Sequence, residues 1–122
     1  MSSSIYKTIL IENYKNPKNE GLLDEFTHES KVANRSCGDE AHLQLYINKE
    51  GIIEKVGYKM TGCAVSIASM SLLSEKIKGL HIKAIEKIEE QDIFDMMGID
   101  ERSGRGKCVL LSRDALRSAI DV

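Results

Sequence analysis

The chain has 122 residues, which is enough for one domain with its own hydrophobic core and too few for two. Hydrophobic residues make up 42% and charged residues 30%, an ordinary composition for a globular protein. The formal net charge of -2 disfavours a general nucleic-acid binder, which normally carries a basic excess. The sequence contains neither an apolar run of the roughly 20 residues that a membrane span needs nor an apolar leader, so we expect a cytoplasmic protein without membrane or nucleic-acid partners.

The first half of the sequence predicts one helix followed by strands. Apolar residues four positions apart predict a helix over 4–14. This helix should end before Pro17, because a residue that precedes proline avoids helical geometry. Residues 18–26 predict an irregular connection, and residues 28–34 predict an edge strand.

Two further strands are predicted by alternation of apolar and polar residues, over 42–48 and 52–60, with a turn between them. Each strand should place one apolar row on the core side of a sheet. The expected rows are Leu43, Leu45 and Ile47 in the first strand, and Ile52, Val56, Tyr58 and Met60 in the second. The three strands together predict an antiparallel meander.

The second half of the sequence predicts helices. They are expected over 64–78, 81–90, 91–97 and 109–121, with glycine stops at Gly79 and Gly98 and a polar, basic loop over 98–107. The last helix begins either with Ser112 as its cap or just after Cys108. Strands grouped before helices favour an α+β fold over an alternating parallel sheet.

Three cysteines, Cys37, Cys63 and Cys108, carry most of the chemistry that the sequence offers. An odd number cannot pair completely within one chain, and without an export signal we expect thiols in a reducing compartment. Their wide spacing excludes a local Cys-x-x-Cys motif. Three buried cysteines that serve as small apolar residues would also fit this spacing.

The local sequence around each cysteine favours a functional site. Each cysteine lies at a junction between expected elements, and Gly38 and Gly62 leave room for a ligand to approach. Cys63 and Cys108 are expected at helix N-termini, where the helix dipole favours a thiolate. Basic residues before the third cysteine would favour it further: Arg102, Arg105 and Lys107.

Asp39 follows Cys37 by two residues, so the two side chains point to the same side of an extended segment. Three thiolates and one carboxylate make four ligands, which suits tetrahedral zinc or an iron–sulfur cluster. A turn residue before a strand would also explain Asp39. The histidines, His28, His42 and His81, are expected on the surface, with His42 the best placed to approach the site.

These local sequences resemble those of the iron–sulfur cluster assembly scaffold family, the group of IscU, SufU and the N-terminal domain of NifU. The resemblance runs from Ile5 to Ile120, and all three cysteines stand in the expected order and context. Its segments are Tyr14-Lys15-Asn16-Pro17-Lys18-Asn19, Cys37-Gly38-Asp39, Thr61-Gly62-Cys63 with Ile67-Ala68-Ser69, and Lys107-Cys108. The chain is therefore identified as a member of this family, with one domain over 1–122.

The resemblance implies a small three-stranded antiparallel sheet packed by helices. It implies that Cys37, Asp39, Cys63 and Cys108 surround one exposed site, which binds iron and a labile [2Fe–2S] cluster and which holds zinc in the isolated protein. It also implies a scaffold rather than an enzyme, with a cysteine desulfurase, an iron donor and apo iron–sulfur recipient proteins as partners. We expect Cys108 to accept sulfur by thiol exchange, because a cysteine on a glycine-containing loop can swing between donor and site.

Two departures bear on the subtype. IscU-type members carry His before the third cysteine and a Leu-Pro-Pro-Val-Lys segment that a dedicated chaperone binds. This chain has Ser103-Gly104-Arg105-Gly106-Lys107 there, without proline, so we expect no such chaperone. Lysine before the third cysteine is similar to SufU, whose insertion of about twenty residues is absent here.

Two other functions are compatible with these residues. A zinc-dependent sulfurtransferase partner of a cysteine desulfurase, like SufU, would hold zinc tightly and transfer sulfur without assembling a cluster. A structural-zinc or interaction module would have unreactive thiols and would unfold when zinc is removed.

Overall fold

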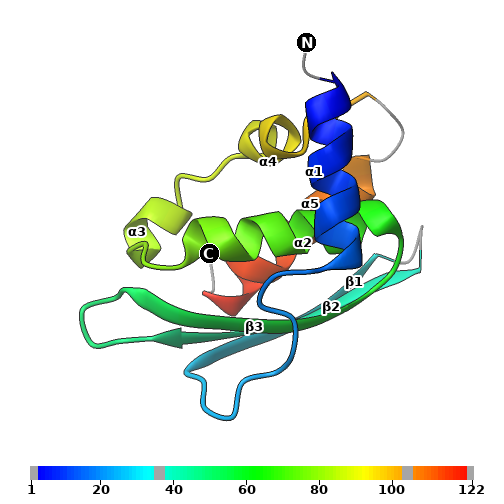
Figure 1. Ribbon diagram of the computed structural model, residues 1–122. Helices are drawn as coiled ribbons and strands as arrows, with labels where there is room; N and C mark the ends of the chain where they lie inside the picture. The colour runs from blue at the N-terminus through cyan, green and yellow to red at the C-terminus, as the bar shows by residue number, and fades with distance from the viewer. Residues whose placement is uncertain (1–2, 35–37, 103–105, 121–122) are drawn as a thin grey trace.

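The computed structural model describes residues 3–34, 38–102 and 106–120. Its elements in chain order are α1 (Ser3–Lys15), β1 (His28–Asn34), β2 (Asp39–Ile47), β3 (Ile53–Thr61), α2 (Ala64–Ile77), α3 (Ile82–Ile85), α4 (Glu90–Met97) and α5 (Gly106–Ala119). The strands form an antiparallel sheet in the order β1-β2-β3, and Figure 1 shows the helices packed on one side of it. The predicted α+β fold is confirmed.

The central strand β2 begins three residues earlier than the predicted start at residue 42. Its pairing with β1 continues to Asn34 opposite Asp39, so the backbone hydrogen bonds of both strands extend the ladder to Asp39. Because side chains alternate along a strand, Asp39 lies on the same face as the buried Leu43 and Leu45. The sheet thus directs an acidic side chain into the space under the helices.

A register shift between Tyr46 and Ile47 changes the predicted face of β3. Tyr46 pairs with Lys55, whereas Ile47 pairs with Ile53, so an extra residue interrupts the alternation. The shift buries Ile53 completely and leaves Ile52 only half-buried. The prediction that Ile52 belongs to the core row was therefore wrong, while Val56, Tyr58 and Met60 are buried as predicted.

Small residues on α2 allow this helix to pack closely between the sheet, α1 and α5. Its buried serines avoid the cost of an unpaired hydroxyl because each has a hydrogen-bond partner. Ser69 donates to the Val109 carbonyl at 2.8 Å, and Ser71 donates to the Asn13 side chain at 2.6 Å. These bonds fix α2 relative to α5 and α1.

The connection after α1 crosses the sheet face opposite the helices, and Figure 1 shows it passing in front of the strands. The backbone N–H of Gly21 donates to the Tyr58 carbonyl at 2.7 Å, and that of Leu23 donates to the Gln44 side chain at 2.8 Å. A side chain at Gly57 would overlap Gly21 and Leu23, so glycine permits this close crossing. The segment therefore covers Gln44, which the alternation pattern alone would leave in solvent.

Two predicted helices have different limits in the structure. The helix expected over 81–90 ends after one turn, at Ile85, and α4 begins at Glu90. Glu89 is the N-cap residue of α4, and its N–H donates to the Asp92 carboxylate at 2.8 Å. The last helix begins at Gly106, earlier than either predicted start. Ser112 is not its cap but lies buried within it, 2.8 Å from the Ser69 hydroxyl. No helix in the described ranges is both long and apolar enough to cross a membrane.

Candidate metal centre

The start of β2, the start of α2 and the first turn of α5 bring three predicted ligands together. One ligand atom each from Asp39, Cys63 and Cys108 lies within 4.8 Å of the other two. Such distances allow one ion to contact all three after small side-chain rotations. The fourth predicted ligand, Cys37, lies outside the described residues.

Asp39 is held in place by the junction between β3 and α2. Its side chain is only 1% exposed, and its Oδ1 accepts the Cys63 backbone N–H at 3.3 Å. Gly62 passes so close to the carboxylate that a Cβ there would overlap it, and its φ of 155° also disfavours any other residue. The Gly62-Cys63 pair therefore makes room for the carboxylate and also binds it.

Cys63 is the N-cap residue of α2 and is half-buried. Its Sγ lies 3.7 Å from Asp39 Oδ2 and 3.5 Å from the Ser66 hydroxyl. Burial is the largest single influence and raises the pKa of this thiol. Hydrogen bonds from the Ser66 hydroxyl, the Ser66 backbone and the Cys108 side chain outweigh burial together with the Asp39 charge, so the pKa of Cys63 is lower than that of an ordinary thiol.

Ser66 is a site residue that the sequence analysis did not single out. It is fully buried, and its hydroxyl donates to Asp39 Oδ2 and lies 3.3 Å from the Cys108 carbonyl oxygen. The available signal was its position one helical turn after Cys63, which places the two side chains on the same face of α2. A serine in an Ala- and Ser-rich helix is more simply interpreted as a small packing residue.

Cys108 lies in the first turn of α5 and is 6% exposed, so the prediction of a loop-borne cysteine was wrong. The helix extends back to include it because residues 108, 112, 115 and 119 form one buried stripe at helical spacing. The preceding residue, Lys107, is exposed at the same helix start. The role of Cys108 as sulfur acceptor stays a prediction.

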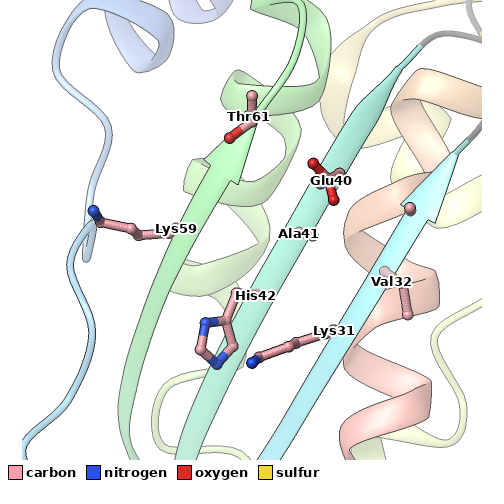
Figure 2. A pocket seen from close by; sticks show the side chains of 8 residues that line it. Lys31, Val32, Glu40, Ala41, His42, Lys59 and Thr61 are labelled. Carbon is pink, nitrogen blue, oxygen red and sulfur yellow. The ribbon is translucent and has the colours of Figure 1, made fainter.

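His42 lies on the opposite face of the sheet from Asp39, three residues along the same strand. Figure 2 shows it on the outer face with Lys31, Lys59 and Glu40, which line a shallow pocket of about 360 Å³. Its Nε2 lies 2.6 Å from the Glu29 carboxylate, and this hydrogen bond is the largest influence that lowers the pKa of Glu29. His42 is thus absent from the group of ligands that the described residues form.

The basic residues expected near the third cysteine have separate outcomes. Arg102 lies 3.4 Å from the Asp100 carboxylate in an exposed pair, which weakens any effect of its charge on the centre. Arg105 lies outside the described residues.

The donor chemistry of the three side chains fits a thiophilic metal. Two thiol sulfurs and a carboxylate oxygen are ligand types that zinc accepts, and thiolates are the usual ligands of iron in clusters. Cys63 is half-buried, whereas Asp39 is buried. An inserted metal would also compensate the buried carboxylate charge.

Comparisons with known proteins identify the family of the chain. The family model described as "NifU-like N terminal domain" matches residues 5–122. The "Iron-sulfur cluster assembly scaffold protein IscU" of Escherichia coli (strain K12) is 35% identical over 118 residues, which cover 94% of this chain and 91% of that protein.

Solved structures share the fold. The crystal structure of FiSufU from Fervidobacterium islandicum AW-1 superposes with a TM-score of 0.78 at 24% identity and covers 98% of this chain and 99% of that one. A nitrogen-fixing NifU-like protein (N-terminal) from Brucella abortus gives a TM-score of 0.80 at 19% identity, with 96% and 92% covered. The family model and the identity to IscU together show that the chain belongs to the NifU-like N-terminal domain family.

Proposed function

We propose that this protein is a scaffold on which iron–sulfur clusters are assembled and from which they are transferred, with Asp39, Cys63 and Cys108 as ligands and Cys37 as the fourth. The convergence of two thiols and a buried carboxylate within 4.8 Å carries the proposal. The family includes proteins named as scaffolds of this kind, which supports the same function here.

The combination of thiolate and carboxylate ligands suits a cluster that must later be released. Thiolates hold iron firmly, whereas a carboxylate is a harder ligand that suits soft-metal clusters less well. The Asp39 carboxylate also accepts hydrogen bonds that fix its position when no cluster is bound. One oxygen ligand among sulfurs therefore supports binding that is strong enough for assembly and weak enough for transfer.

Sulfur delivery belongs to the same proposal. A protein thiolate attacks the outer sulfur of a persulfide on a cysteine desulfurase, the S–S bond breaks, and the desulfurase cysteine leaves as a thiolate. We assign this acceptor role to Cys108, which must become accessible first because it is 6% exposed. Mass spectrometry after a single turnover should find the persulfide on Cys108; a persulfide confined to Cys63 would refute this assignment.

Anaerobic reconstitution tests the scaffold proposal. Protein, cysteine desulfurase, cysteine and ferrous iron are mixed, and visible absorption and Mössbauer spectra report the cluster. We expect a [2Fe–2S] cluster that transfers to an apo-ferredoxin and that is lost in Cys37→Ala, Cys63→Ala and Cys108→Ala. Ser69→Ala is the matched control, because it removes a buried group from α2 without touching the ligands.

The outcome that would refute a scaffold is equally specific. Zinc-loaded protein that accelerates the desulfurase while no cluster forms would assign the zinc-dependent sulfurtransferase function instead. If the thiols neither bind metal nor react, the remaining function is that of an interaction module. We place the protein in the cytoplasm as part of this proposal, because cluster assembly needs reduced thiols.

A further inference from the structure

We propose that Ser66 is a positioning residue of the metal centre: its buried hydroxyl orients the Asp39 carboxylate toward the two cysteine sulfurs and thereby raises the affinity of the centre for divalent metal. This inference rests on the proposed function, because it requires that Asp39, Cys63 and Cys108 bind metal. It adds a residue that is itself no ligand.

The position of Ser66 is unusual for a packing serine. Its hydroxyl oxygen is a hydrogen-bond neighbour of the three proposed ligand residues that the structure describes: the Asp39 carboxylate, the Cys63 sulfur at 3.5 Å and the Cys108 carbonyl oxygen at 3.3 Å. The side chain is fully buried, so its orientation is fixed by these contacts rather than by solvent. One hydroxyl therefore links the three elements that meet at the centre.

The role of Ser66 depends on which acceptor its single hydroxyl proton is donated to. A hydroxyl donates one hydrogen bond, and the Asp39 carboxylate and the Cys108 carbonyl oxygen are both acceptors. While Cys63 is a thiol or a metal ligand, the proton goes to Asp39 Oδ2, because the ionised oxygen is the nearer and stronger acceptor. When Cys63 is ionised in the metal-free protein, its sulfur, 3.5 Å from the Ser66 oxygen, is a second possible acceptor for this proton.

This arrangement persists when the cysteines become ligands. Metal binding removes the Cys63 thiol proton, but the hydrogen bond from Ser66 to Asp39 does not use that proton. A carboxylate oxygen accepts more than one bond, so Oδ2 can keep Ser66 as a donor while it contacts a metal. Hydrogen bonds of this kind orient metal ligands, and their removal typically weakens metal affinity by about 10–100-fold.

Cobalt(II) titration under anaerobic, reducing conditions tests the inference on the full chain. The affinity comes from competition with a chelator, and the ligand-field bands report a tetrahedral, sulfur-containing site. We expect Ser66→Ala to bind cobalt about 10–100-fold more weakly than the unmodified protein. Ser69→Ala is the matched control, because Ser69 is equally buried one turn along α2 but bonds to Val109 and Ser112.

A double-mutant cycle distinguishes positioning from packing. If Ser66 acts through Asp39, Ser66→Ala has no further effect on cobalt affinity in an Asp39→Ala background. Ser66→Thr keeps the hydroxyl and should retain most of the affinity. If Ser66→Ala does not fold, as circular dichroism would show, the cycle is repeated with trimethylamine N-oxide present, because this osmolyte favours the folded state.

Three results would overturn the inference. The inference fails if Ser66→Ala binds cobalt as tightly as the unmodified protein. Action through the carboxylate is excluded if the losses of cobalt affinity in Ser66→Ala and Asp39→Ala are additive in the double mutant. An equal loss in Ser66→Ala and Ser66→Thr assigns the effect to packing. If the unmodified protein binds no cobalt, the metal centre itself fails, which is a separate result from a failure confined to Ser66.

Discussion

Cys63 is half-buried, and yet neighbouring groups stabilise its thiolate form. The Ser66 hydroxyl, the Ser66 backbone and the Cys108 side chain hydrogen-bond to it, and they lower its pKa despite burial and the nearby Asp39 charge. A cysteine that served only as a small apolar residue would gain nothing from such neighbours. The environment of this side chain therefore matches a ligand or nucleophile.

This environment predicts the pH dependence of Cys63 alkylation. Because its pKa is lowered, a larger fraction is thiolate at any pH below the ordinary thiol pKa of about 8.5. Iodoacetamide modification of the metal-free protein, resolved by peptide mass spectrometry, should reach its half-maximal rate below that pH. A midpoint at or above the value of a cysteine peptide measured in parallel would contradict the lowered pKa.

Gly62 makes a second prediction at this scale. Alanine at this position would collide with the Asp39 carboxylate, so Gly62→Ala should weaken zinc binding markedly as well as destabilise the fold. Gly79→Ala is the matched control, since Gly79 also has a positive φ of 86° but has open space around it. We expect Gly79→Ala to cost about 1–2 kcal/mol of unfolding free energy and to leave zinc affinity unchanged.

Competition with a chelator for zinc and urea unfolding of the metal-free protein separate the two effects of Gly62→Ala. If Gly62→Ala and Gly79→Ala lose the same stability and bind zinc equally well, close contact between Gly62 and Asp39 is irrelevant to the centre.

At the scale of elements, the β2–β3 hairpin determines which residues form the core beneath α2. The register shift at Ile47 gives Ile53 the buried position, and two backbone bonds hold it there: its N–H donates to the Leu80 carbonyl at 2.9 Å, and the Gly79 N–H donates to its carbonyl at 2.8 Å. The end of the hairpin is thereby tied to the end of α2.

The core position of Ile53 predicts different costs for two adjacent substitutions. Ile53→Ala should reduce the unfolding free energy by about 2–5 kcal/mol, because it deletes a fully buried aliphatic side chain. Ile52→Ala should cost clearly less, since Ile52 is half-buried. Urea unfolding measures both, and an Ile52→Ala variant that is the less stable of the two would place the register shift elsewhere.

The same elements show where sequence patterns suffice and where they do not. Alternation identifies β2 and the buried Leu43 and Leu45, because their period of two is uninterrupted. The extra residue at the hairpin end has no local signature, so the pattern favours Ile52 over Ile53. The early start of α5 accompanies the burial of Cys108 by tertiary packing, which local sequence patterns do not encode.

At the scale of the whole molecule, three elements distant in sequence meet at one corner, and each supplies one candidate ligand. The resemblance of local motifs predicted Asp39, Cys63 and Cys108 as ligands, and the glycine before Cys63 marks a junction where the chain turns. The role of Ser66 was not predictable, since its contacts depend on how β2 and α5 approach α2. Single-sequence patterns carry local geometry and not the distances between elements.

X-ray absorption at the zinc K-edge of the zinc-loaded protein tests most directly whether these elements form one centre. The account predicts zinc bound by thiolate sulfurs near about 2.3 Å and one oxygen near about 2.0–2.2 Å, with sulfur ligands lost in Cys63→Ala and Cys108→Ala. A shell of nitrogen and oxygen alone, or a sulfur shell unchanged in both variants, would contradict it.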